Sequence, residues 1–192
     1  MATVDLCRVD FAVIPDEPIF GGVIEASQAI TDEYYDNANV IDEKTFPPHV
    51  SLHICTVPRE SVVQLAESMQ ALAGALPELV PTGVERSDGG YVMLDIERTD
   101  DLVALHEAVL ELAAHAREGM GGNDKYGSPY IRDLFTPHLS LAKVDYRDQA
   151  GATRIGRETL GELGAAPSRS LDLCDIGERS ERWEILASIA RS

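Results

Sequence analysis

Two distant segments of the chain carry the same short pattern, and this duplication limits the possible folds more than any other feature. Residues 46–52 have the sequence FPPHVSL, and residues 135–141 have the sequence FTPHLSL. The segments share Phe, Pro, His, Ser and Leu at matching positions, and each opens a run typical of a β-strand. We therefore interpret the chain as an internal duplication in which each half carries one copy of the motif.

Alternation of side chains along a strand predicts where the polar residues of the motif point. His49 and Ser51 are two residues apart, so they are expected on one face of the first strand. His138 and Ser140 have the same spacing in the second strand. The residues that alternate with them are apolar and are expected to point into a core. Two such strands predict a polar cleft shared by two half-domains.

A third histidine, His53, follows His49 by four residues, a spacing that suits metal ligands on a helix. Pro47 and Pro48 precede the segment and β-branched residues surround it, which favours a strand. On a strand these imidazoles would be about 13 Å apart, too far to bind one metal ion, so we expect no metal site. Alternation places His53 on the cleft-facing side, as a substrate contact or as a structural histidine.

Hydrophobic periodicity predicts strands and helices over the whole chain. Strands are expected at residues 3–14, 49–57, 80–87, 90–97, 135–146, 169–177 and 183–190. Helices are expected at residues 19–37, 58–76, 101–117 and 147–166. This order indicates the α+β class. No segment has the composition of a linker, so residues 1–192 are expected to form one domain of two pseudo-symmetric lobes, each with an antiparallel-rich sheet and packed helices, around a central cleft.

The chain is strongly acidic, with 33 Asp and Glu residues against 16 Lys and Arg residues and a formal net charge of −17. Binding to a long polyanion depends on Lys and Arg side chains. We therefore expect no binding to duplex DNA, and we expect a small anionic ligand held by a few local donors.

Cysteine usage and hydropathy indicate a cytoplasmic protein. Cys7, Cys55 and Cys174 are odd in number and lie in apolar runs, which argues against a disulfide framework. The N-terminal residues show no basic patch followed by an apolar region, so no signal peptide is expected. No apolar run is long enough for a transmembrane helix, so no membrane partner is expected.

The sequence resembles the two-histidine (2H) phosphoesterase superfamily, which includes 2′-5′ RNA ligase-like proteins and cyclic phosphodiesterases. Members carry two His-x-Ser/Thr-x motifs, each on a strand, in two pseudo-symmetric lobes, and residues 49–52 and 138–141 match this pattern. The resemblance implies action on 2′,3′-cyclic phosphates, 2′-5′ linkages or related cyclic nucleotides, with neither a metal nor a cofactor. The chain departs from the family in having Ser51 and Ser140 where Thr is commoner, and His53 where a small or apolar residue is usual.

Hydrolysis of a cyclic phosphodiester requires a base that activates water, an acid for the leaving oxygen and donors for the phosphoryl oxygens. An imidazole, with an unperturbed pKa of about 6.5, suits both proton-transfer roles. We hypothesise that His49 and His138 form the acid/base pair. The hydroxyls of Ser51 and Ser140 would donate hydrogen bonds to the phosphate. The sequence therefore predicts a metal-independent phosphodiesterase for a small cyclic-phosphate or 2′-5′-linked nucleotide, and leaves open which histidine is the acid and which phosphate is released.

A polar, glycine-rich loop precedes the second motif and offers further candidates for substrate binding. Tyr126 and Tyr130 could stack on a nucleobase, and Arg132 could hold the phosphate. The alternative interpretation is an ordinary surface loop. Lys143 is expected to face away from the cleft, because it follows Ser140 by three residues in a strand.

Three other functions stay open on the sequence. A 2′-5′ RNA ligase-type enzyme would act on RNA ends, with binding that depends strongly on salt. A non-catalytic nucleotide-binding module would bind its ligand without turnover. A biosynthetic enzyme could use the same twin-histidine cleft for other acid/base chemistry.

Overall fold

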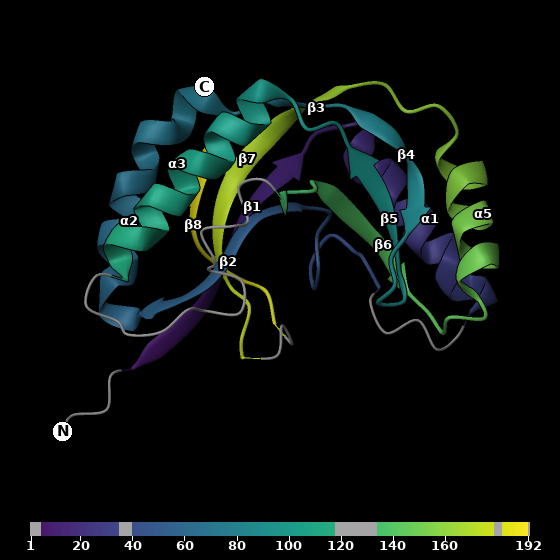
Figure 1. Cartoon of the computed structure of the whole chain (residues 1–192), viewed down its shortest axis with the longest axis horizontal. Helices are drawn as coiled ribbons and strands as arrows, with labels where there is room; N and C mark the ends of the chain where they lie inside the picture. The colour runs from purple at the N-terminus through teal and green to yellow at the C-terminus, as the bar shows by residue number, and fades with distance from the viewer. Residues whose placement is uncertain (1–4, 35–39, 118–133, 179–181, 192) are drawn as a thin grey trace.

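The protein is built from two antiparallel sheets that form the two limbs of an arch (Figure 1). The computed structural model describes residues 5–34, 40–117, 134–178 and 182–191. Helices lie on the outer side of both limbs, and the inner faces of the sheets look toward the centre of the arch (Figure 1). The α+β class expected from the sequence is confirmed.

The larger sheet joins strands from both ends of the chain. Its strands are β1 (Leu6–Pro15), β2 (Val50–Pro58), β3 (Glu78–Leu79), β7 (Ala166–Asp175) and β8 (Glu184–Ala190). Their order is β2-β1-β7-β3, and β8 pairs with β7. The first motif therefore lies on an outer strand, next to a central β1 whose other neighbour, β7, comes much later in the sequence.

The smaller sheet carries the second motif. Its strands are β4 (Pro81–Arg86), β5 (Tyr91–Ile96) and β6 (His138–Lys143), in that order. Helices α1 (Ile19–Glu33) and α5 (Gln149–Leu160) pack on each other and on this sheet. Helix α1 follows β1 in the chain but packs with the smaller sheet, so each limb combines segments that are distant in sequence (Figure 1).

Helices α2 (Val62–Met69) and α3 (Asp100–Ala116) pack on each other and cover the larger sheet (Figure 1). The start of α3 is well specified, because the Thr99 side chain accepts a hydrogen bond from the Leu102 backbone N–H, and Asp100 and Asp101 complement the helix dipole. Short 3-10 segments flank α2 on both sides, at Arg59–Ser61 and Gln70–Ala75. The single helix expected over 58–76 is therefore divided into three pieces.

Two other helices end earlier than the periodicity indicated. Helix α1 ends at Glu33 because Tyr34 adopts an extended conformation. Helix α5 ends at Leu160 because Gly161 has a φ of +55°, in the left-handed region that stops a helix. Apolar residues continued beyond both ends, so the hydrophobic pattern alone did not mark these boundaries.

The pairing of β1 with β2 contains a β-bulge inside the first motif. Ala12 pairs with Ser51, whereas Phe11 pairs with His53, so Leu52 is an extra residue on β2. The bulge reverses the alternation of side chains from that point on. His53 therefore lies opposite Phe11, a core residue, and is itself only 6% exposed. The expectation that His53 shares the cleft-facing side with the motif histidine is wrong, because it assumed a strand without a bulge.

An equivalent bulge interrupts the pairing of β5 with β6. Met93 pairs with Ser140, whereas Val92 pairs with Ala142. The pairing then continues to Lys143, whose exposed side chain consequently lies on the same face as Ser140. The expectation that Lys143 faces away from the cleft is wrong for the same reason. Both copies of the motif thus carry the same local irregularity.

Cys7, Cys55 and Cys174 are buried and form no disulfide. None of the helices in the described residues combines the length and the apolar composition that a membrane crossing requires.

Candidate active site

The two motif histidines have the same local geometry at the start of their strands. The ring Nδ1 of His49 lies 2.8 Å from the carbonyl oxygen of Pro47, and the ring Nδ1 of His138 lies 2.9 Å from that of Thr136. A carbonyl oxygen can only accept a hydrogen bond, so Nδ1 carries a proton and donates it. In a neutral ring the free lone pair is then on Nε2. Each motif therefore fixes the tautomer that presents a basic nitrogen on the other side of the ring.

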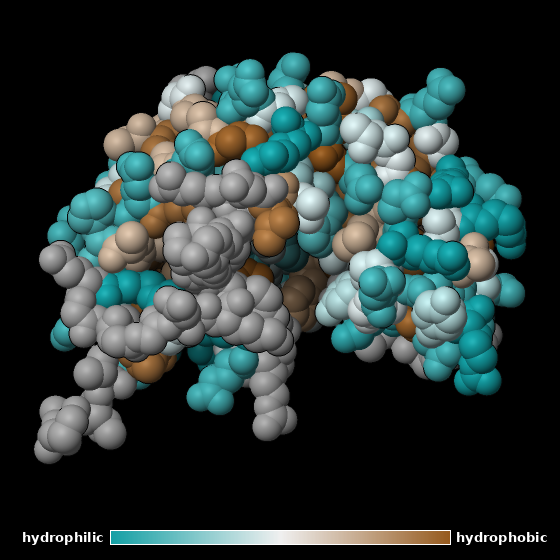
Figure 2. All heavy atoms as spheres, in the orientation of Figure 1, coloured by the Kyte–Doolittle hydropathy of each residue, from teal (hydrophilic) through white to brown (hydrophobic). Residues whose placement is uncertain are grey.

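The structure brings the two histidines together although they belong to different sheets. Strands β2 and β6 contact each other. The imidazoles of His49 and His138 are near enough to interact electrostatically, and His138 contributes to lowering the pKa of His49. The space-filling view shows the surface hollowed between the two limbs of the arch (Figure 2).

A buried carboxylate, Asp10 on β1, lies beneath the first motif. The Ser51 hydroxyl donates a hydrogen bond to Asp10 Oδ2 at 2.6 Å, and His49 Nε2 lies 3.8 Å from the same oxygen. Asp10 is 2% exposed, and burial raises the pKa of its carboxyl to about 7, although the hydrogen bond from Ser51 and the nearby Arg8 act in the opposite direction. Asp10 was not predicted from the sequence. Its signal was a charged side chain in β1 directly before the apolar run of residues 11–15.

The imidazole of His49 is held neutral by its surroundings. Its ring centroid lies 4.3 Å from that of Trp183, and Trp183 in turn contacts Phe46, with ring centroids 6.2 Å apart. Burial lowers the pKa of His49 to about 4, with the hydrogen bond to Pro47 opposing the shift and His138 adding to it. At neutral pH His49 can therefore accept a proton.

Trp183 is positioned by an anchored C-terminal segment. The preceding residue, Arg182, donates from Nε to Asp175 Oδ1 at 3.1 Å, and Arg59 Nη2 lies 3.4 Å from Asp175 Oδ2. Asp175 is 1% exposed. Burial by itself would raise the pKa of this carboxyl, but hydrogen bonds from Arg182 and the Gly177 backbone hold it below its usual value. The ionised Asp175 thus fixes the segment that places an indole against His49.

The second motif lacks an acidic residue at the position equivalent to Asp10. Asp10 lies two residues before Ala12, the strand partner of Ser51. Tyr91 lies two residues before Met93, the strand partner of Ser140, so Tyr91 occupies the equivalent position. Lys143 Nζ lies 4.8 Å from the centroid of the Tyr91 ring. Within the described part of the chain, Ser140 makes no side-chain hydrogen bond. The two motifs are therefore alike in sequence and different in their surroundings.

Replacement of Asp10 by Asn is expected to change how stability depends on pH. Because folding raises the pKa of Asp10, this residue stabilises the fold fully below its unfolded pKa of about 4, and the contribution is lost as the pH rises to about 7. Relative to the parent protein, Asp10→Asn should gain stability over this range by about 1.4 kcal/mol per pH unit, on the order of 3–4 kcal/mol in all. Urea unfolding at a series of pH values measures the difference, and parallel curves would contradict it.

One further candidate from the sequence, His53, is not part of this cluster. His53 is buried on the opposite side of β2, as described above. Tyr126, Tyr130 and Arg132 lie outside the described residues. Over the described ranges, no group of three or more His, Cys, Asp and Glu side chains is placed to hold a metal ion.

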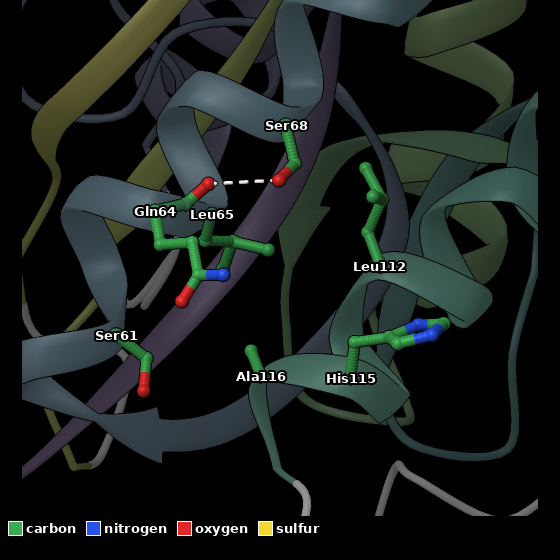
Figure 3. A pocket seen from close by; sticks show the side chains of 7 residues that line it. All are labelled: Ser61, Gln64, Leu65, Ser68, Leu112, His115 and Ala116. Atoms are coloured by element: carbon green, nitrogen blue, oxygen red, sulfur yellow. Dashed lines mark hydrogen bonds between the residues drawn. The ribbon is translucent and has the colours of Figure 1, made fainter.

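A separate cavity of about 290 Å³ lies between α2 and α3 (Figure 3). It is lined by Ser61, Gln64, Leu65, Ser68, Leu112, His115 and Ala116. The Ser68 hydroxyl donates to the Gln64 carbonyl oxygen at 2.9 Å, so part of its polar lining is already paired within α2. None of the motif residues lines this cavity.

Comparison with known proteins agrees with the fold and with the family resemblance of the sequence. A family model described as the 2′-5′ RNA ligase superfamily matches residues 24–174. The structure is similar to that of E. coli LigT complexed with NADP+, with a TM-score of 0.54 and 13% identity over 97% of this chain and 98% of that chain. Kluyveromyces marxianus Usb1 with uridine monophosphate aligns with a TM-score of 0.47 and 14% identity over 97% of this chain and 98% of that chain. No curated protein matches this chain. Because the family model covers most of its length, the chain belongs to the 2′-5′ RNA ligase (2H phosphoesterase) superfamily.

Proposed function

We propose that this protein is a metal-independent phosphodiesterase that hydrolyses a small cyclic-phosphate or 2′-5′-linked nucleotide. The observation that carries the proposal is the pair of fixed tautomers. The imidazoles of His49 and His138 each donate a hydrogen bond from Nδ1 to a backbone carbonyl oxygen, which leaves Nε2 for proton transfer, and the two rings come together from the two sheets. One neutral and one protonated imidazole supply the base and the acid that cleavage of a phosphodiester requires.

The surroundings of the two rings assign their roles. His49, held neutral with a pKa of about 4, is the base, which leaves His138 as the acid. Water gives a proton to His49 Nε2 as its oxygen bonds to phosphorus. The bond from phosphorus to the leaving ribose oxygen breaks, and His138 Nε2–H protonates that oxygen. Ser51 and Ser140 donate to the non-bridging oxygens, where negative charge increases.

The charge of the chain favours a small substrate over a long one. With a net charge of −17, the protein repels an extended polyanion, whereas one phosphate needs only local donors. Lys143, exposed on the same face as Ser140, can add a positive charge there. Tyr126, Tyr130 and Arg132 stay proposed substrate contacts on the sequence alone. His53 is not proposed as one, because it is buried on the core side.

The test is a substrate panel in the presence of EDTA. Cyclic mononucleotides, cyclic dinucleotides and 2′-5′-linked dinucleotides are incubated with the protein, and mass spectrometry identifies the products. We expect turnover of at least one class with EDTA present, and release of a 2′- or 3′-phosphate. A preparation carrying both His49→Ala and His138→Ala controls for contaminating phosphodiesterases. Turnover that requires added metal would overturn the mechanism, and saturable binding without turnover would favour a binding module.

Action on RNA ends is the second candidate, because the family model bears the description of a 2′-5′ RNA ligase. Oligonucleotide and mononucleotide substrates distinguish the two. Binding through many phosphates weakens steeply as salt rises, whereas binding of one phosphate depends on salt much less. We expect weak salt dependence. A kcat/KM that is much higher for oligonucleotides and falls steeply with salt would favour the RNA-end enzyme.

A further inference from the structure

The two motif serines occupy the same position in the repeated sequence but differ in the hydrogen bonds that their hydroxyls donate. Ser51 donates its only hydrogen to Asp10 Oδ2 at 2.6 Å. In the described part of the chain no side-chain partner occupies the Ser140 hydroxyl. A hydroxyl has one hydrogen and two lone pairs. While Asp10 is a carboxylate, Ser51 can therefore offer only lone pairs to a phosphoryl oxygen, and lone pairs repel an anion.

A proton on Asp10 reverses this hydrogen bond. The protonated Oδ2 donates to Ser51 Oγ, and the hydrogen of Ser51 becomes available to a ligand. Two observations favour this state. Asp10 Oδ1 is buried without a hydrogen-bond partner among the described residues, a costly arrangement for an ionised carboxylate. Burial also raises the pKa of Asp10 to about 7, so a small free-energy change suffices to protonate it near neutral pH.

We propose that Asp10 is a positioning residue that acts through Ser51, so that binding of a phosphate-type anion is coupled to uptake of one proton from solvent by Asp10. This inference rests on the proposed function only in placing the anion at the twin motifs. It adds that the motifs are unequal: no described residue takes the hydrogen of Ser140, whereas the hydrogen of Ser51 is released to a ligand only when Asp10 is protonated.

Other charged groups near Asp10 do not take over this role. On its own strand Arg8 interacts with Asp10 electrostatically and lowers its pKa. Directly before β2, Nε2 of the neutral His49 lies 3.8 Å from Asp10 Oδ2. On β7 the strand partner of Asp10 is Cys174, whose thiol pKa is raised by burial and by Asp172, so it stays protonated. Asp172, also on β7, is buried as well, and burial raises the pKa of its carboxyl, but its Oδ1 accepts from the Ser188 hydroxyl at 2.6 Å. Of these groups, Asp10 is the one that accepts the hydrogen of a motif serine.

Sulfate is the probe for the test, because its charge is constant over the pH range used and it cannot be hydrolysed. The chain has one tryptophan, Trp183, and its ring contacts His49, so its fluorescence reports on anion binding next to the site. Dissociation constants are measured at about pH 5.5 and about pH 8.5, on either side of the Asp10 pKa. His138 is unchanged in every variant, so its contribution to sulfate binding cancels when the dissociation constants of two variants are compared at the same pH.

The matched pair is Ser51→Ala and Ser140→Ala. Loss of a hydrogen bond to a charged ligand weakens binding by about tenfold. We expect Ser51→Ala to weaken sulfate binding by about this factor at the lower pH and to leave it unchanged at the higher pH. Ser140→Ala should weaken binding at both. Equal losses for Ser51→Ala at the two pH values would overturn the proposal.

Asp10→Asn provides the second arm, because its amide can donate to Ser51 Oγ at any pH. It should bind sulfate about tenfold more tightly than the parent protein at the higher pH. Most of this gain should vanish in Ser51→Ala and persist in Ser140→Ala. A gain of the same size in both backgrounds would mean that Asp10 acts through its charge alone, and would overturn the proposal.

The failure of this inference can be told apart from failure of the proposed function. Sulfate binding requires no turnover, so the serine contrast can hold even if no substrate in the panel is cleaved. Conversely, if cyclic phosphates are hydrolysed but Ser51→Ala and Ser140→Ala show the same pH dependence, only the role of Asp10 is lost. Calorimetry near pH 7.5 in two buffers of different ionisation enthalpy counts the protons directly. With a tenfold coupling, Ser51→Ala should take up about half a proton fewer than the parent protein at this pH.

Discussion

His49→Ala and His138→Ala should each lower kcat by about a thousandfold on the substrate that the panel identifies. Each change removes one of the two nitrogens that move protons, while the backbone of the motif strands stays intact. The double variant should be little worse than either single one, because the two rings work as a unit. Steady-state kinetics measures the effect, with circular dichroism to confirm that each variant is folded.

The chain provides a matched control in His115. Its ring Nδ1 is also hydrogen-bonded to a carbonyl oxygen, that of Glu111, at 2.7 Å. The His115 side chain, however, is exposed on α3 and lines the separate cavity of Figure 3. His115→Ala should keep kcat and KM within about twofold of the parent values. Near-normal turnover by either motif variant would refute the acid/base pair.

The assignment of roles can be tested with an activated substrate. An aryl phosphodiester has a leaving group that departs without protonation, so it does not need a general acid. His138→Ala should therefore lose much less activity on this substrate than on a cyclic phosphate. His49→Ala should be impaired on both, because a base is still required. The reverse pattern would exchange the two roles.

Phe135→Ala should destabilise the protein by about 3–4 kcal/mol. Phe135 opens the second motif, is 6% exposed and stacks on His106, with ring centroids 4.1 Å apart and planes at 4°. The same His106 places its Nδ1 2.8 Å from the Leu52 carbonyl oxygen, at the bulge of the first motif. Truncation leaves a cavity and removes a contact that links the two motifs. Urea unfolding with Trp183 fluorescence measures the loss.

Phe46→Ala is the control, because Phe46 occupies the same position in the first motif. It is only partly buried and contacts Trp183 with ring centroids 6.2 Å apart. We expect a loss of about 1–2 kcal/mol. Equal losses in the two variants would show that the duplicated phenylalanines have equivalent packing, contrary to the structure.

The sequence predicted the fold class because hydrophobic periodicity is a local property, and the strands at both motifs follow from it. It could not predict the bulges, since one extra residue on a strand changes the register without changing the pattern of residue types. His53 and Lys143 were assigned to the wrong faces for that reason alone. Alternation held only up to Ser51 and Ser140.

The partners of the motif residues were hidden from the sequence for a different reason. Asp10, Trp183 and Ser51 come from three separate strands or their flanks, and only the pairing of β1 with both β2 and β7 brings them together. A single sequence contains no signal for such long-range pairing. The charge of Asp10, directly before the apolar run of residues 11–15 in β1, was a local sign that a buried polar group needed a partner.

The position of β1 between β2 and β7 has a consequence for how the chain is made. While the ribosome is still synthesising the middle of the protein, β1 can pair with β2 but has its other edge uncovered, because β7 has not yet been produced. An uncovered central strand is prone to wrong pairing. The aromatic ring beside His49, Trp183, also follows β7 in the chain. The first histidine therefore acquires its final environment only after β7 and the segment that follows it have been synthesised, long after its own strand.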